Sequence, residues 1–197
     1  MYAYIKGKIA FKTPTFVYLD NNGIGYHINI SLYTYSKIER LDEVKLFTYL
    51  LVREDIMSLY GFYDENEKQL FEKLISVSGI GATTAQIILS SMSPGEIINA
   101  IANENEMVFK NVKGIGIKTA KRIILDLRDK VGKISAFEGS VQIPVTGSDF
   151  KNEALAALLA LGINRTKAES VIISTLKSDQ SINSVETLVK TALKQLV

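Results

Sequence analysis

Apolar and polar residues alternate along most of the first 62 residues, which is typical of β-strands with one buried face. The segments YIKGKIAF, TFVYLD and GYHINI follow this pattern, and DNNG before the last of them predicts a tight hairpin turn. Two more apolar segments, EVKLFTYLLV and IMSLYGF, flank the charged residues Arg53, Glu54 and Asp55. About five short strands with glycine at bends favour a small OB-type barrel over an SH3-like barrel.

The apolar period changes to that of a helix at Asp64. Asp64 stands at a helix start with Glu67 three residues later, which predicts a capping box with Asp in place of Ser or Thr. From there to Val131 the chain has short helical patterns separated by Gly or Pro. The apolar face of the first of these helices comprises Leu70, Phe71, Leu74 and Ile75.

The rest of the chain divides into a linker and a second helical segment. Residues 132–148 contain Gly, Ser and Pro without sustained periodicity, which predicts a flexible linker. Residues 149–197 contain three amphipathic patterns, with Asn164 and Ser184 as expected N-caps and Gly162 as a C-cap. We therefore predict an α+β multidomain protein: a barrel (1–63), a helical domain (64–131), the linker and a three-helix bundle (149–197).

An internal repeat stands out in the central helical segment. LISVSGIGATTAQIIL, from Leu74, aligns with FKNVKGIGIKTAKRII, from Phe109, at an offset of 35 residues. The identical pairs are Val77/Val112, Gly79/Gly114, Ile80/Ile115, Gly81/Gly116, Thr84/Thr119, Ala85/Ala120 and Ile88/Ile123. Each copy has the form helix, Gly-Ile-Gly hairpin, helix.

This repeat has the features of an anion site. Glycines permit a sharp turn and let a ligand approach the backbone, and the following helix begins with unpaired N–H groups and a positive dipole end. Lys118, Lys121 and Arg122 follow the second hairpin, which favours a phosphodiester ligand over a purely structural helix–helix turn. The chain lacks the GxxxxGK[ST] pattern, and its Gly-x-Gly units follow helices rather than strands, so we predict no ATP site.

Composition narrows the possible chemistry. The 197 residues include no cysteine, which excludes disulfides, thiolate metal sites and cysteine nucleophiles. No apolar run approaches the ~20 residues of a membrane span, and the alternating N-terminus is unlike a signal peptide, so we predict a cytoplasmic protein. The net charge is only +2, but seven basic residues lie between Lys113 and Lys133, as on a DNA-binding surface or a solvated helix face.

Glu54 and Asp55 admit three interpretations. They could be a polar hairpin tip, part of a metal site, or charges that repel a partner. Two carboxylates hold Mg²⁺ only with help from phosphates and water, and no third acidic residue or His lies in the same hairpin. His27, the single histidine, is interpreted as a structural residue on a strand.

The two repeat units resemble the helix-hairpin-helix motif of proteins that bind DNA without sequence preference. Together with LLVREDIMSLYGF (Leu50–Phe62) and EALAALLALGINRTKAESVI near the C-terminus, they make the whole chain similar to the RuvA family, which recognises Holliday junctions. The resemblance implies a homotetramer, or an octamer on DNA, that holds a four-way junction open in recombination and repair. It further implies that the third, UBA-like domain recruits a hexameric AAA+ motor, RuvB, and that a resolvase, RuvC, can follow.

The resemblance also implies roles for individual residues. Glu54 and Asp55 match the acidic pin at the centre of the tetramer, where they would repel phosphates. Thr83 is a departure, because a basic residue is common there and Lys118 fills the equivalent place in the second hairpin. Leu158, Leu159, Leu161 and Ile163 are candidate motor contacts or, alternatively, core residues of the bundle. The expected DNA-backbone contacts are Gly79, Gly81, Thr83, Thr84, Gly114, Gly116, Lys118, Thr119, Lys121 and Arg122.

We therefore predict a junction-binding subunit without catalytic residues, cofactor or metal, accessory to an ATP-dependent helicase. Two alternatives belong to other classes. A structure-specific nuclease or glycosylase could use the same hairpins for grip. A protein-interaction module could work mainly through the three-helix tail.

Overall fold

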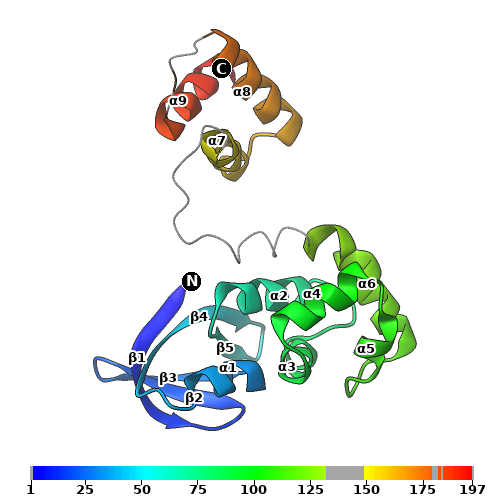
Figure 1. Ribbon diagram of the computed structural model, residues 1–197. Coiled ribbons are helices and arrows are strands. Elements are labelled where there is room, and N and C mark those ends of the chain that lie inside the picture. Colours follow the sequence, from blue (N-terminus) through cyan, green and yellow to red (C-terminus); the bar gives the residue numbers. More distant parts are fainter. Residues whose placement is uncertain (1, 132–148, 179–181, 183, 197) are drawn as a thin grey trace. The chain divides into compact units, whose positions relative to one another are not determined.

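The structure is a computed structural model that describes residues 2–131, 149–178, 182 and 184–196. The chain divides into two compact units, Met1–Gly139 and Ser140–Val197 (Figure 1). The first unit holds both the strands and the central helices. The predicted linker at 132–148 lies outside the described residues.

Five strands form a closed barrel with the order β1-β2-β3-β5-β4. All neighbours are antiparallel except β3 and β5, whose parallel pairing closes the barrel. The tight turn predicted by DNNG is present, with Asn22 and Gly23 at φ 51° and 87°. This confirms the five-stranded OB-type barrel. The strands are β1 (Tyr4–Lys12), β2 (Phe16–Asn21), β3 (Ile24–Ile30), β4 (Glu43–Val52) and β5 (Met57–Phe62), with α1 (Leu32–Ile38) between β3 and β4.

The central helices share one hydrophobic core, and that core extends onto the barrel. Phe71 is fully buried, with ring centroids 5.5, 5.0 and 4.9 Å from those of Tyr49, Tyr60 and Phe62 on β4 and β5. Strands β4 and β5 of the barrel therefore form a surface on which the central helices pack (Figure 1). The helices are α2 (Glu65–Ile75), α3 (Ala82–Ser91), α4 (Pro94–Ala102), α5 (Glu106–Lys110) and α6 (Ile117–Val131).

A buried carboxylate joins α1 to α2. Glu67 is fully buried and accepts hydrogen bonds from the hydroxyls of Ser31 and Thr34, the latter at 2.5 Å. The N–H of Tyr63 donates to the same carboxylate at 3.1 Å. Burial raises the pKa of Glu67 to about 7, although the three hydrogen bonds favour the ionised form and oppose this effect.

This network corrects the predicted capping box. Asp64 does cap α2, because its side chain accepts from the N–H of Glu67 at 2.8 Å. The reciprocal half is wrong: the Glu67 side chain does not return to the Asp64 N–H but turns to Ser31, Thr34 and Tyr63. A capping pattern read along one helix cannot include hydroxyls that lie about thirty residues away in the sequence and are adjacent only after folding.

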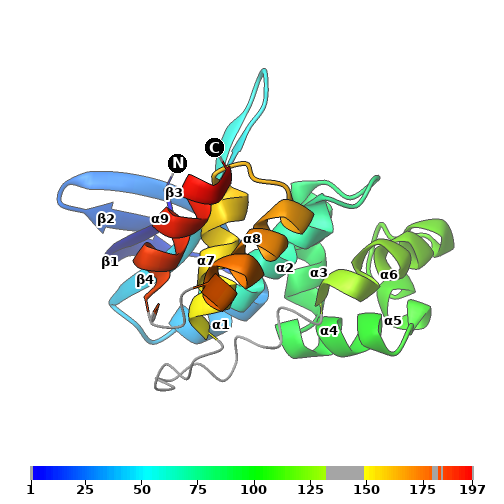
Figure 2. The same cartoon turned by 90° about the horizontal axis from the view of Figure 1, so that it is seen from above.

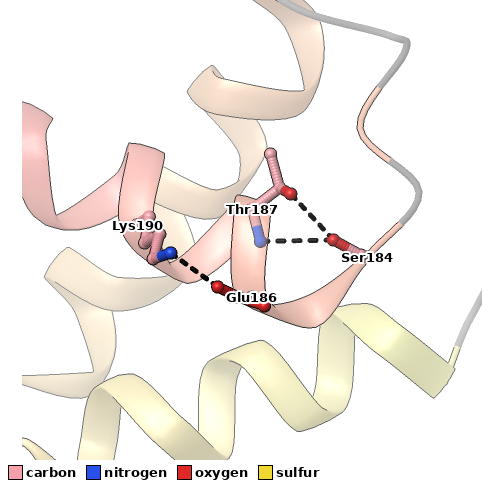
Figure 3. A network of polar contacts seen from close by, with 4 residues as sticks. All are labelled: Ser184, Glu186, Thr187 and Lys190. Atoms are coloured by element: carbon pink, nitrogen blue, oxygen red, sulfur yellow. Dashed lines mark hydrogen bonds and ion pairs between the residues drawn. The ribbon is translucent and has the colours of Figure 1, made fainter.

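The second unit is a three-helix bundle of α7 (Asp149–Ala160), α8 (Arg165–Ser178) and α9 (Val185–Leu196) around its own apolar core. Gly162 ends α7 as expected, with φ +83° and the N–H of Ile163 bonded to the Leu158 carbonyl. Figure 3 shows the start of α9, where the Ser184 hydroxyl accepts from the Thr187 N–H at 3.3 Å. Beside it, Lys190 pairs with Glu186 one turn earlier.

The buried carboxylate predicts a pH-dependent stability. Between pH 4.5 and about 7 the folded protein retains a proton on Glu67 that the unfolded chain releases. The free energy of unfolding should therefore fall as the pH rises through this window, by roughly 3 kcal/mol from this one group. Urea unfolding between pH 4.5 and 8 should show this fall in the parent protein but not in Glu67→Gln.

Glu65→Gln, which removes an exposed carboxylate from the first turn of the same helix, is the matched control. It should keep the pH profile of the parent. Parallel profiles for the parent and Glu67→Gln would contradict the assignment.

Candidate nucleic-acid interface

The two Gly-Ile-Gly hairpins adopt the same backbone geometry. In the first, between α2 and α3, the N–H of Ile80 bonds to the Val77 carbonyl at 3.0 Å. In the second, between α5 and α6, the N–H of Ile115 bonds to the Val112 carbonyl at 3.1 Å. All four of these apolar side chains are buried in the shared core, so each hairpin is fixed by its own isoleucine.

The glycines of each hairpin have different roles. Gly79 and Gly114 have φ +91° and +87°, a conformation that favours glycine. Gly81 precedes α3 with an ordinary φ of −89°, and Gly116 is not among the positive-φ glycines of the described residues. A Cβ added at Gly81 or Gly116 would meet nothing within 4 Å. The fold does not require glycine at these two positions, whereas a ligand approaching the backbone would.

The helix that follows each hairpin can receive an anion. The first turn of α3 has no side-chain cap, so its N–H groups remain available. Thr83 is exposed and Thr84 half-buried there, as are Lys118 and Thr119 at the matching positions of α6. Unpaired N–H groups, the helix dipole and a nearby hydroxyl together suit a phosphate oxygen.

The basic side chains of α6 differ in their contacts. Lys118 is exposed and has no ion pair or hydrogen bond within the described part of the chain. Lys121 lies 3.9 Å from the Glu106 carboxylate, and both side chains are largely exposed, so this pair is weak. Arg122 was expected to contact phosphate; its Nη1 donates to the Ser78 carbonyl of the first hairpin at 3.3 Å.

The basic run beyond the hairpin is partly neutralised. Arg128 donates to Glu104 at 2.7 Å and also lies 3.7 Å from Asp129. Lys133, the last member of the run, lies outside the described residues. Three described lysines of the run are exposed and form no ion pair with another described residue: Lys113 and Lys118 beside the second hairpin, and Lys130 near the end of α6.

Glu54 and Asp55 lie at the tip of a two-stranded arm. β4 pairs with β1 only as far as Phe47, and β3 meets β5 only from Leu59 onward. The intervening part of β4 and β5 pairs only within its own hairpin, which projects from the barrel in Figure 2. Both carboxylates are exposed, and the N–H of Arg53 bonds to the Ile56 carbonyl at 2.8 Å across the tip.

Apolar side chains flank these carboxylates. Val52, Ile56 and Met57 are 64%, 48% and 76% exposed. The apolar segments on either side of Arg53, Glu54 and Asp55 gave no sign that this hairpin projects from the barrel, because the end of the ladders to β1 and β3 is set by tertiary pairing. No group of three or more His, Cys, Asp or Glu side chains that could hold a metal ion occurs among the described residues.

The four candidate motor contacts divide into core and surface residues. Leu158 is fully buried in the bundle, which corrects its assignment, because a side chain without exposed surface cannot contact a partner. Ile163 is partly buried against the same core. Leu159 and Leu161 are 38% and 60% exposed.

No helix in the described part of the chain is long and apolar enough to span a membrane.

The glycine geometry makes a testable distinction. Gly79→Ala and Gly114→Ala force a side chain into a positive-φ conformation and should each lower stability by about 1–2 kcal/mol. Gly81→Ala and Gly116→Ala, the matched controls, should unfold within about 0.5 kcal/mol of the parent. Thermal or urea unfolding of the four variants measures this, and equal destabilisation of all four would contradict the division of roles.

Comparison with known proteins agrees with this architecture. Residues 1–61 match the family model described as RuvA N terminal domain, and residues 71–129 match the SAM-like helix-hairpin-helix tandem. Three relatives are each named Holliday junction branch migration complex subunit RuvA. That of Cytophaga hutchinsonii is 46% identical over 98% of this chain and 99% of its own.

The other two relatives align over the full length of both chains. The Flavobacterium psychrophilum protein is 47% identical and the Bacteroides fragilis protein 44% identical to this chain. These alignments therefore include the barrel, the paired hairpins and the three-helix unit. The chain belongs to the RuvA family.

Proposed function

We propose that this chain is the DNA-binding subunit of a Holliday junction branch migration complex. The observation that carries the proposal is the pair of matching hairpins with open glycines at Gly81 and Gly116. Each presents free N–H groups at a helix start, and the second adds Lys118. These groups suit phosphate oxygens and read no base edges, so binding should be independent of sequence.

Selectivity for a junction requires something more than backbone grip. The arm that carries Glu54 and Asp55 supplies a candidate, because a narrow projection with two exposed carboxylates repels phosphates that approach it. At the centre of a four-way junction the backbones are already parted, whereas ordinary duplex would have to pass the charges. The arm therefore disfavours duplex and leaves an open junction acceptable.

The remaining parts of the proposal concern partners. An assembly of copies, a tetramer or an octamer on DNA, would bring several arms to the crossover point. The bundle of α7 to α9 would recruit the AAA+ motor RuvB, with Leu159 and Leu161 as its exposed apolar contacts. RuvC would act on the same junction. In this scheme the chain works in the cytoplasm as an accessory subunit, and the motor supplies ATP hydrolysis.

The central experiment compares a synthetic four-way junction with duplex of equal arm length in a gel shift. The full chain should bind the junction more tightly. Incubating the labelled junction with Mg²⁺ tests the alternative of a structure-specific nuclease, for which cleavage by the pure protein is required. Equal affinity for both DNAs would contradict the proposal.

The charge at the second hairpin predicts the salt dependence. Lys118→Ala and Lys121→Ala together should reduce the slope of log K against log [salt] by about 0.9 for each phosphate that is no longer neutralised. Lys177→Ala, which removes an exposed lysine near the end of α8, is the control and should leave the slope unchanged. An unaltered slope in the double variant would remove the two lysines from the interface.

The arm predicts weaker discrimination rather than weaker binding. Glu54→Gln with Asp55→Asn keeps the size of both side chains and removes their charge. This variant should bind the junction at least as well as the parent and bind duplex more tightly, because the repulsion is gone. Glu39→Gln with Asp42→Asn is the matched control, because it removes two exposed carboxylates beside the barrel that form no ion pair among the described residues, and it should leave the selectivity unchanged. Unchanged selectivity would make Glu54 and Asp55 a polar hairpin tip.

A further inference from the structure

One hydrogen bond links α6, the helix that follows the second hairpin, to the loop of the first hairpin. Arg122, in the second turn of α6, donates from Nη1 to the carbonyl of Ser78 at 3.3 Å across 44 residues of sequence. Ser78 is exposed and directly precedes Gly79, the positive-φ residue of the first hairpin. The buried side chains of both hairpins share one apolar core, and this bond adds a link between exposed groups at the surface.

The same bond constrains a neighbouring N–H group. In a planar trans peptide the carbonyl of one residue and the N–H of the next point in opposite directions. A Ser78 carbonyl held by Arg122 therefore sets the direction of the Gly79 N–H. That N–H has no hydrogen-bond partner among the described residues, so it remains free to bind an anion on the opposite side of the peptide.

The first copy of the internal repeat has no side chain that could form the equivalent bond. The residue matching Arg122 in the first copy, at the offset of 35, is Ile87, which has no side-chain donor. The first hairpin, with Thr83, also lacks the lysine that the second has as Lys118. The hairpin without a cation of its own is thus the one that receives an arginine from its neighbour.

We propose that Arg122 is a positioning residue for the first hairpin: it holds the Ser78–Gly79 peptide so that the Gly79 N–H faces the DNA phosphate. The role rests on the proposed DNA-binding function and refines it, because it assigns Arg122 to the loop of the first hairpin rather than to a phosphate at the second. The core already holds the two backbone sites at a fixed spacing, and Arg122 adds the orientation of one peptide in the first of them.

The test is a double-mutant cycle on junction DNA with the full chain. Arg122→Met removes the donor and keeps an unbranched apolar stem. Gly81→Ala places a methyl group in the open approach to the first hairpin, and Gly116→Ala does the same at the second. Each single variant should weaken junction binding by about tenfold.

If Arg122 acts through the first hairpin, its removal should matter little once that hairpin is blocked. Arg122→Met with Gly81→Ala should bind about as weakly as either single variant, whereas Arg122→Met with Gly116→Ala should be about a hundredfold weaker than the parent. The salt slope of Arg122→Met should equal that of the parent, since the N–H group that Arg122 positions is neutral, while Lys118→Met should lower it by about 0.9.

Three other results would contradict the proposed role of Arg122. A lower slope for Arg122→Met, with an effect on affinity that adds to that of Gly81→Ala, would show direct phosphate binding and overturn the proposal. Equal additivity with both glycine variants and an unchanged slope would reduce Arg122 to general stabilisation, which also overturns it. If neither glycine variant weakened binding, the hairpins themselves would not bind DNA, and the proposed function would fail before this inference was reached.

Discussion

The buried Glu67 carboxylate is the constraint on which the arrangement of the first unit depends. A charge-bearing group without exposed surface must have its hydrogen bonds satisfied, and its donors come from Ser31, Thr34 and Tyr63. These donors fix α2 against α1 and the barrel, and the packing of Phe71 on β4 and β5 completes the joint. No buried side-chain polar atom of the described residues is left without a partner.

Fixing α2 also fixes the hairpins. The first hairpin begins where α2 ends, and its second helix, α3, is held to the barrel by Gln86, whose amide donates to the Ile30 carbonyl at 2.6 Å. The second hairpin shares the same core through Val112 and Ile115. The barrel and the shared core therefore hold both hairpins in place, so in the proposed function their N–H groups bind phosphate without a large rearrangement. Preorganisation of this kind lowers the entropic cost of binding.

The proposed function assigns attraction and repulsion of DNA to different elements. Positive charge and backbone donors lie at the helix starts, where rigidity favours a defined geometry. The carboxylates lie at the tip of an arm that pairs only with itself, away from the ladder that closes the barrel. If the proposed roles hold, affinity for DNA and selectivity for junctions depend on separate parts of the first unit.

The sequence by itself determined the elements and most of the candidate site. Strand alternation and the Asn-Gly turn predicted the barrel, and the repeat around Gly79 and Gly114 predicted two equal hairpins, because both signals are local in the chain. Tertiary structure alone decided three further points: the partners of Glu67, the burial of Leu158 and the bond from Arg122 to Ser78. Each depends on groups that are distant in the sequence and become neighbours only when the helices pack. A pattern of neighbouring residues therefore cannot predict these contacts.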